Sequence, residues 1–166
     1  DIARPATQII EAVSAAAERI AQALLLFLLA ATLAIVVLRY VFGFGSSALS
    51  EAALFAHGLA FLLAAPAALG RGAHVRVDVF FTRFSPKQKA WVDVAAFYLF
   101  LMPMTFAILA TADQVIGLSW RIAERSSESD GLPGWFLVKT AIPLFAVLLV
   151  AQGVAWAARA ACAIRG

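Results

Sequence analysis

Two ionisable side chains within one long apolar run, Glu51 and His57, are the best placed of this chain to do chemistry. An ionisable group inside a membrane span is costly and is therefore a functional candidate. Glu51 could bind a proton or a cation, or it could form an ion pair with Arg39 across a tight turn, and we expect the ion pair. His57 lies about 9 Å further along a helix and about 120° around it, so the two side chains do not share a face.

Other chemistry at these positions has little support. A bis-histidine haem site needs a second histidine at similar depth, whereas His74 lies in the polar connection that follows, so we expect His57 to pack against another helix or subunit. Ser50 and His57 have the wrong spacing for a hydrolase site on one helical face. With one cysteine, Cys162, no glycine-rich phosphate loop and no zinc-type spacing, we expect no enzyme activity, no cofactor and no metal.

The composition indicates that a membrane surrounds these residues. Of 166 residues, 63% are hydrophobic, whereas soluble domains are usually about half apolar. The formal net charge of +3 could suggest nucleic acid as a partner. The cations flank apolar runs, however, so we expect them to meet lipid headgroups and expect no nucleic-acid partner.

The hydrophobic pattern predicts an all-α membrane protein with four transmembrane helices arranged as two hairpins, N-in/C-in, preceded by an amphipathic interfacial helix. We expect a single domain over residues 1–166. An alternative for the first nineteen residues is a frayed polar tail. The predicted segments are the interfacial helix 1–19, span 1 at 20–41, span 2 at 48–69, a cytoplasmic loop at 70–86, span 3 at 87–117, a periplasmic segment at 118–134 and span 4 at 135–158.

Local signals mark the start and the middle of the third span. Ser85, Pro86 and Gln88 predict a helix start, with the serine as N-cap, the proline at the first helical position and the glutamine at the third. Pro103 lies near the middle of the span and predicts a bend, because proline cannot donate the helical hydrogen bond.

The orientation follows from the basic residues. With the N-terminus in the cytoplasm, nine of the thirteen lysines and arginines fall on the cytoplasmic side and four on the outer side. The positive-inside rule therefore favours N-in/C-in. The connection between the second and third spans sets this topology through a cluster of five cations: Arg71, Arg76, Arg83, Lys87 and Lys89.

Several motifs together resemble those of a known family. They are RYVFGFG (39–45), Glu51 early in the second span, GRGAHVRVDVFF (70–81), the SP-K start of the third span, and WRIAERSSESDGLP (120–133). In this combination the chain resembles the small membrane subunit of tripartite ATP-independent periplasmic (TRAP) transporters, from the first span to Gln152.

The resemblance implies a non-catalytic scaffold subunit of a sodium-coupled secondary importer of an organic acid, in the bacterial cytoplasmic (inner) membrane. A periplasmic solute-binding protein would capture the acid, and a large multi-span membrane subunit would carry it inward. In that reading Arg39, Glu51 and His57 are candidates for the subunit interface, and none of them binds substrate. The candidates for contact with the binding protein are Trp120, Arg121, Glu124, Arg125 and Glu128.

Two alternatives belong to other functional classes. The chain could be a small proton-coupled exporter acting as a homo-oligomer, with Glu51 as the coupling carboxylate, or a haem-bearing anchor of a respiratory complex. Transporters tend to place polar groups and broken helices near the midplane, whereas the midplane of the first, third and fourth spans is almost wholly apolar. The pattern therefore favours a protein that packs against a larger partner.

Overall fold

The computed structural model describes residues 3–71 and 84–165, almost all of them helical. Within this part, four helical stretches are long and apolar enough to cross a membrane. The described residues form no strand, only one isolated bridge between Arg125 and Pro133. The predicted all-α fold with four helices able to span a bilayer is confirmed. The elements are α1 (Ala3–Phe42), α2 (Ser47–Gly70), α4 (Pro86–Ala96), the π-helix η1 (Phe97–Leu101), α5 (Met102–Arg121), α6 (Trp135–Lys139) and α7 (Ala141–Arg165).

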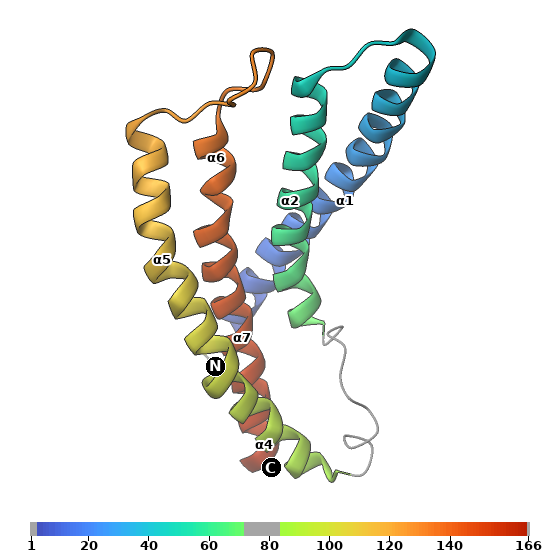
Figure 1. Cartoon of the computed structure of the whole chain (residues 1–166). Coiled ribbons are helices and arrows are strands. Elements are labelled where there is room, and N and C mark those ends of the chain that lie inside the picture. The colour runs from blue at the N-terminus through green and yellow to red at the C-terminus, as the bar shows by residue number, and fades with distance from the viewer. Residues whose placement is uncertain (1–2, 72–83, 166) are drawn as a thin grey trace.

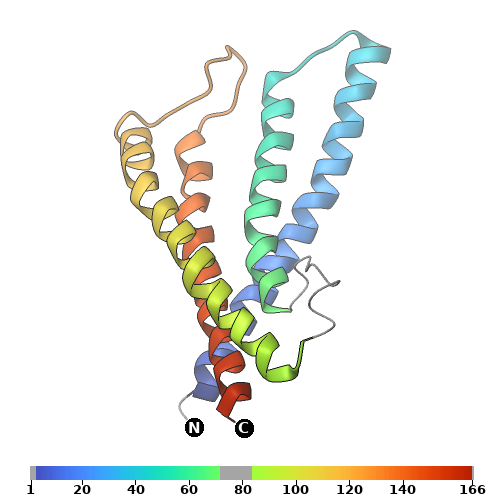
Figure 2. The same ribbon diagram turned by 60° about the horizontal axis from the view of Figure 1, so that its bottom comes forward.

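The helices run roughly along one direction (Figure 1). Both chain termini lie at one end, which we call the terminal end. The opposite end, the loop end, carries residues 43–46 between α1 and α2 and residues 122–134 between α5 and α6. The helices form two pairs: α1 with α2, and the stretch α4–η1–α5 with the stretch α6–α7. The two pairs lie close together near the terminal end and diverge toward the loop end (Figures 1 and 2).

The first element is one continuous helix of 40 residues, about 60 Å long at the helical rise. No break separates the predicted interfacial helix 1–19 from span 1 in the described residues, so the two are one helix, and a position of residues 1–19 at the membrane surface stays a prediction. Residues 6–42 contain neither glycine nor proline, so nothing local interrupts the helix. Ser14, Ala17 and Ala21 are buried and share one face, which holds this early part of α1 against its neighbours.

The interior is built from small side chains. Among the described residues, almost all buried apolar side chains are alanines, the exceptions being Pro66, Leu69, Phe97 and Leu149. Many large apolar side chains point outward instead; Leu26 and Phe106 are 71% and 74% exposed. Small residues at helix contacts let backbones approach closely, which is typical of packing inside a bilayer, where large apolar side chains face lipid or another subunit.

The predicted start of the third span is confirmed. The Gln88 backbone N–H donates to Ser85 Oγ (3.3 Å), and the Ser85 N–H donates to Gln88 Oε1 (2.8 Å), with Pro86 as the first helical residue. This reciprocal pair satisfies two backbone donors that a helix N-terminus leaves free.

An irregular turn precedes Pro103. The Met102 N–H bonds to the Phe97 carbonyl, five residues back, and residues Phe97–Leu101 form a π-helix. Since Pro103 has no N–H to donate, a wider turn at this point accommodates the interrupted ladder. The turn directs Phe97 onto α7 at Gly153, where an added Cβ would lie 2.7 Å from the Phe97 ring.

Three of the five predicted topology-setting cations are described. Arg71 is the C-cap of α2, and Lys87 and Lys89 lie in the first turn of α4. Arg76 and Arg83 lie outside the described residues.

Candidate functional site

The polar structure of the loop end centres on Glu51, in the second turn of α2. The hydroxyl of Ser126 donates to Glu51 Oε1, and the Leu132 backbone N–H donates to Oε2 at 2.7 Å. Both donors belong to the connection 122–134, more than seventy residues further along the chain. Glu51 therefore ties this connection to α2, and through it one pair of helices to the other.

A second carboxylate holds the same connection to the start of α2. Asp130 Oδ2 accepts a hydrogen bond from the Ser47 backbone N–H at 3.0 Å. A negative charge at a helix N-terminus also complements the helix dipole. The hydrogen bond from the Ser47 N–H lowers the pKa of Asp130 below its usual value, so the contact belongs to the ionised form.

A third carboxylate braces the other end of the connection. Lys139 Nζ donates to both oxygens of Glu124, at 2.7 and 2.6 Å, and to Ser119 Oγ at 3.2 Å. The Ser119 hydroxyl donates to Glu124 in turn. The hydrogen bond from Lys139, followed by that from Ser119, lowers the pKa of Glu124. This triad joins the end of α5 to α6.

The backbone where α5 ends is strained. Ala123 has a φ of +46°, in the left-handed region that favours glycine. The Ala123 N–H bonds to the Trp120 carbonyl and the Glu124 N–H to the Ser119 carbonyl, both at helix C-cap spacing. Helix α5 thus ends in a Schellman motif that has alanine in the usual glycine position.

The turn within the connection is closely packed. A Cβ added at Gly131 would lie 2.1 Å from Ser126 Oγ and 3.0 Å from Glu51 Oε1. The Ser126 N–H bonds to the Leu132 carbonyl and the Gly131 N–H to the Glu128 carbonyl, both at 3.2 Å. We call residues 122–134, with these contacts, the braced loop.

Aromatic side chains pack beneath the braced loop. Trp120 donates its indole N–H to Thr140 Oγ1 at 3.0 Å and meets Phe136 edge-on at 4.7 Å between ring centroids. Trp135 meets Phe55 of α2 in a similar way at 5.0 Å, which adds a contact between the helix pairs. Edge-to-face pairs of this kind stabilise by about 0.5–1.5 kcal/mol beyond their buried area.

The structure separates the residues predicted to contact a binding protein into two groups. Glu124 and Trp120 are engaged within the loop end, with Lys139 and Thr140 respectively. Arg121, Arg125 and Glu128 are exposed, and their side chains have no partner among the described residues. The second group therefore leaves exposed charges on the braced loop, at Arg125 and Glu128, and beside it at the end of α5, at Arg121.

The predicted ion pair between Glu51 and Arg39 is wrong. Both oxygens of Glu51 are occupied by the braced loop, and Arg39, at the end of α1, is exposed. His57 is exposed on α2, without a partner in the part of the chain that the structure describes. The described residues contain no group of three His, Cys, Asp or Glu side chains that could hold a metal ion.

Sequence reasoning missed Ser126, Leu132, Asp130, Ser119 and Lys139 as members of this site. The motif WRIAERSSESDGLP contains three of them, Ser126, Asp130 and Leu132. That motif indicated a resemblance to a family but gave no information about which residues are in contact. A single sequence gives no signal for a backbone N–H that meets a carboxylate 81 residues away.

The fold and the site define a class: a multi-pass α-helical membrane protein with a loop held by carboxylate hydrogen bonds at one end of its spans. A family model described as "Tripartite ATP-independent periplasmic transporters, DctQ component" matches residues 28–163. Since the match covers most of the chain, the chain belongs to this family, the small membrane subunits of TRAP transporters. No curated protein and no solved structure matches the chain.

Proposed function

We propose that this chain is the scaffold subunit of a sodium-coupled importer of an organic acid in the bacterial inner membrane. It docks against the large membrane subunit, and its braced loop lies in the periplasm, where it offers a surface to the solute-binding protein. The observation that carries the proposal is the braced loop itself, because three carboxylates hold it in place while the charged side chains of Arg121, Arg125 and Glu128, on or beside it, stay exposed.

The braced loop suits recognition of a soluble partner. Arg121, Arg125 and Glu128 are exposed charges on a surface whose backbone is fixed by internal hydrogen bonds. Such a surface loses little conformational entropy on binding. Exposed charges at the rim of an interface mainly change the association rate and its dependence on salt.

For the face that meets the large subunit we propose one stripe of α2. Ser50, Leu54, His57 and Phe61 are exposed and recur at spacings of four, three and four residues, as on one face of a packed helix. An imidazole facing lipid is costly. A protein partner that supplies a hydrogen bond to His57 removes that cost.

The experiment coexpresses the tagged chain with its large subunit, purifies the pair in detergent and reconstitutes it in liposomes. We expect the large subunit to copurify, and we expect organic-acid uptake to require a sodium gradient and the binding protein. A chain that purifies alone and transports a solute by itself contradicts the proposal.

Two matched pairs of variants locate the surfaces. Arg125→Gln should raise the concentration of binding protein that gives half-maximal uptake by several-fold, whereas Lys87→Gln, an equal loss of charge at the terminal end, should not. Phe61→Ala should reduce copurification, whereas Phe106→Ala, an exposed phenylalanine on α5, should not. The reverse result for the second pair places the docking face on α5.

The exporter alternative makes a different prediction for Glu51. A coupling carboxylate must release and rebind protons, so Glu51→Gln would abolish proton flux by the chain alone. Glu51 accepts two hydrogen bonds that hold the braced loop, which is a structural role. The scaffold proposal therefore expects no proton flux in either form of the protein.

A further inference from the structure

Asp113 of α5 carries an exposed carboxyl group within an apolar helix, and it has no partner among the described residues. Ionisable side chains inside membrane spans almost always face protein or water and pair with another group. A group that pairs with Asp113 must therefore come from outside the described part of the chain.

The contacts of α5 place Asp113 well inside the span. Near the loop end, the Trp120 indole donates to Thr140, the C-cap of α6. Nearer the terminal end, the Phe97 ring lies against Gly153 of α7. Asp113 lies between these two contacts, seven residues from Trp120, which is about 10 Å along the helix.

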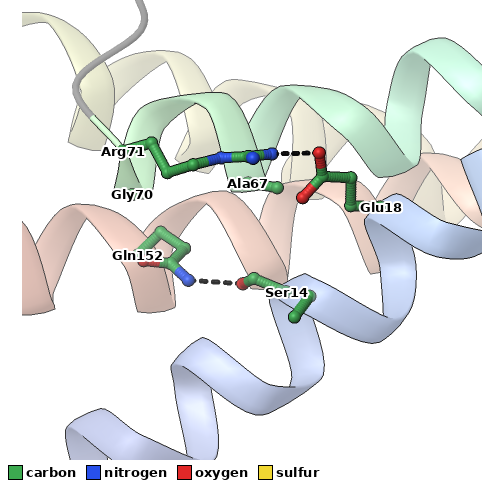
Figure 3. Close-up of a pocket in the computed structure, with 7 residues that line it drawn as sticks. Ser14, Glu18, Ala67, Gly70, Arg71 and Gln152 are labelled. Carbon is green, nitrogen blue, oxygen red and sulfur yellow. Dashed lines mark hydrogen bonds and ion pairs between the residues drawn. The ribbon is translucent and has the colours of Figure 1, made fainter.

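Two further contacts relate these levels to α2. Trp135 of α6 meets Phe55 of α2, and Gln152 of α7 lies beside Gly70, the last residue of α2 (Figure 3). The part of α5 that holds Asp113 therefore lies at the depth of α2. Because α2 has 24 residues, it is about 36 Å long, which suits the thickness of a bilayer.

Asp113 belongs to a stripe of α5 that we call the Asp113 seam: Phe106, Ala110, Asp113 and Gly117. These residues recur at spacings of four, three and four, as on the contact face of a packed helix. None of them is buried. An added Cβ at Gly117 would meet nothing within 4 Å, so no contact among the described residues explains a poor helix former at this position.

The charge of Asp113 distinguishes the possible occupants of this seam. Lipid tails offer no partner to a carboxylate, and headgroups stay near the surface. A second copy inserted in the same way brings another Asp113 to the same depth, so like charges would meet. A spanning helix with an arginine or a lysine at this depth supplies a charge-assisted hydrogen bond.

We propose that the Asp113 seam docks a membrane-spanning helix of a different protein, which carries an arginine or a lysine opposite Asp113. The cation bonds to the carboxylate, and the small residues Ala110 and Gly117 let the two helices approach closely. This contact is separate from the α2 stripe and does not rest on the proposed transport function.

The test uses designed single-span helices of leucine and alanine as probes, each with arginine, leucine or glutamate at the depth of Asp113. The full chain carries a donor fluorophore on Cys162, its only cysteine, and is reconstituted in liposomes with an acceptor-labelled probe. We expect the arginine probe to associate about fivefold more tightly than the leucine probe, which corresponds to about 1 kcal/mol. The glutamate probe should associate no more tightly than the leucine probe.

Variants locate the contact. Asp113→Leu should remove the preference for arginine, and Asp113→Glu should retain it. Two exposed alanines of α5 form a matched pair, because Ala110 belongs to the seam whereas Ala107 lies about 120° around the helix from Asp113. Ala110→Leu should weaken association with the arginine probe and Ala107→Leu should not, with circular dichroism and gel filtration showing that all variants fold.

Equal association of the three probes, or a preference for arginine that survives Asp113→Leu, overturns the proposal and leaves Asp113 covered by lipid or water. Donor- and acceptor-labelled copies of the chain test the other occupant. If these copies associate and Ala110→Leu separates them, a second copy occupies the seam, which also overturns the proposal. Copies that stay apart support it.

Discussion

At the scale of single residues, three carboxylates hold separate segments of the chain together by accepting hydrogen bonds. Glu51, Glu124 and Asp130 each accept hydrogen bonds from groups distant in sequence or in another element. A carboxylate offers two oxygens and several lone pairs, so one side chain can hold two donors at once. This explains how a connection of thirteen residues, 122–134, stays ordered at the end of four helices.

Glu51→Gln should loosen the braced loop. The amide keeps only one acceptor oxygen and no charge, so the Ser126 hydroxyl and the Leu132 N–H cannot both be satisfied as before. We expect tryptic cleavage after Arg125 to become several times faster. The control is His57→Gln, which removes the other ionisable side chain of α2 and should cleave at the wild-type rate. Equal rates for all three proteins would show that Glu51 does not hold the loop.

Ala123→Gly should stabilise the protein. A left-handed conformation costs a residue with a Cβ about 1–2 kcal/mol, and glycine avoids this cost. Glycine also loses more conformational entropy on folding, which offsets part of the stabilisation. The net expectation is a gain of about 0.5–1 kcal/mol, seen as a higher midpoint of thermal unfolding in detergent. Ala110→Gly, at an exposed helical position of α5, should lower the midpoint instead. A lower midpoint for both variants would contradict the argument from backbone strain.

At the scale of elements, helices approach each other where side chains are small. The contact of η1 with α7 is the clearest example, because the Phe97 ring lies over Gly153 and leaves no room for a Cβ. The π-helical turn directs this ring inward, and Phe97 is only 3% exposed.

Gly153→Ala should therefore destabilise the packing of η1 on α7. The new Cβ would lie 2.7 Å from the Phe97 ring and 3.0 Å from Leu101, and overpacking of this kind typically costs about 1–3 kcal/mol. Thermal unfolding in detergent measures the loss. The matched control is Gly58→Ala in α2, where an added Cβ meets nothing within 4 Å. It should be neutral or favourable by up to about 1 kcal/mol, and a similar loss at both positions would refute the steric explanation.

The braced loop should also loosen in acid. The pKa values of Asp130 and Glu124 are lowered in the folded protein. Their contribution is therefore present above the unfolded pKa values, near 4, and is lost as the pH falls toward the lowered folded values. Hydrogen exchange of the amides in 122–134, corrected for intrinsic rates, should accelerate below about pH 4. Asp130→Asn should weaken this dependence, and an unchanged profile in that variant would exclude Asp130 as a cause.

At the scale of the whole molecule, the features that could be predicted from the sequence are those set by residues close together in the chain. Long apolar runs predicted the four spanning helices, and Ser85 with Gln88 predicted the start of the third. The partners of Glu51 could not be predicted, because they lie 75 and 81 residues away in the sequence. Arg39 was the cation nearest to Glu51 in the sequence before the second span, so it was the expected partner. The continuity of α1 was readable, since residues 6–42 contain no glycine or proline, but the polar positions before residue 20 favoured a separate interfacial helix.

The orientation of the molecule is the last prediction, and its only cysteine makes it testable. Cys162 is exposed near the terminal end, whereas Arg125 is exposed on the braced loop. Because nine of the thirteen basic residues belong to the predicted cytoplasmic side, we expect the braced loop outside and Cys162 inside. In spheroplasts, a membrane-impermeant maleimide should label the double variant Arg125→Cys, Cys162→Ser without lysis. It should label native Cys162 only after lysis. Removal of Arg125 takes one cation from the outer side and so reinforces the expected topology. The opposite labelling pattern would place the braced loop in the cytoplasm, where no periplasmic partner can reach it.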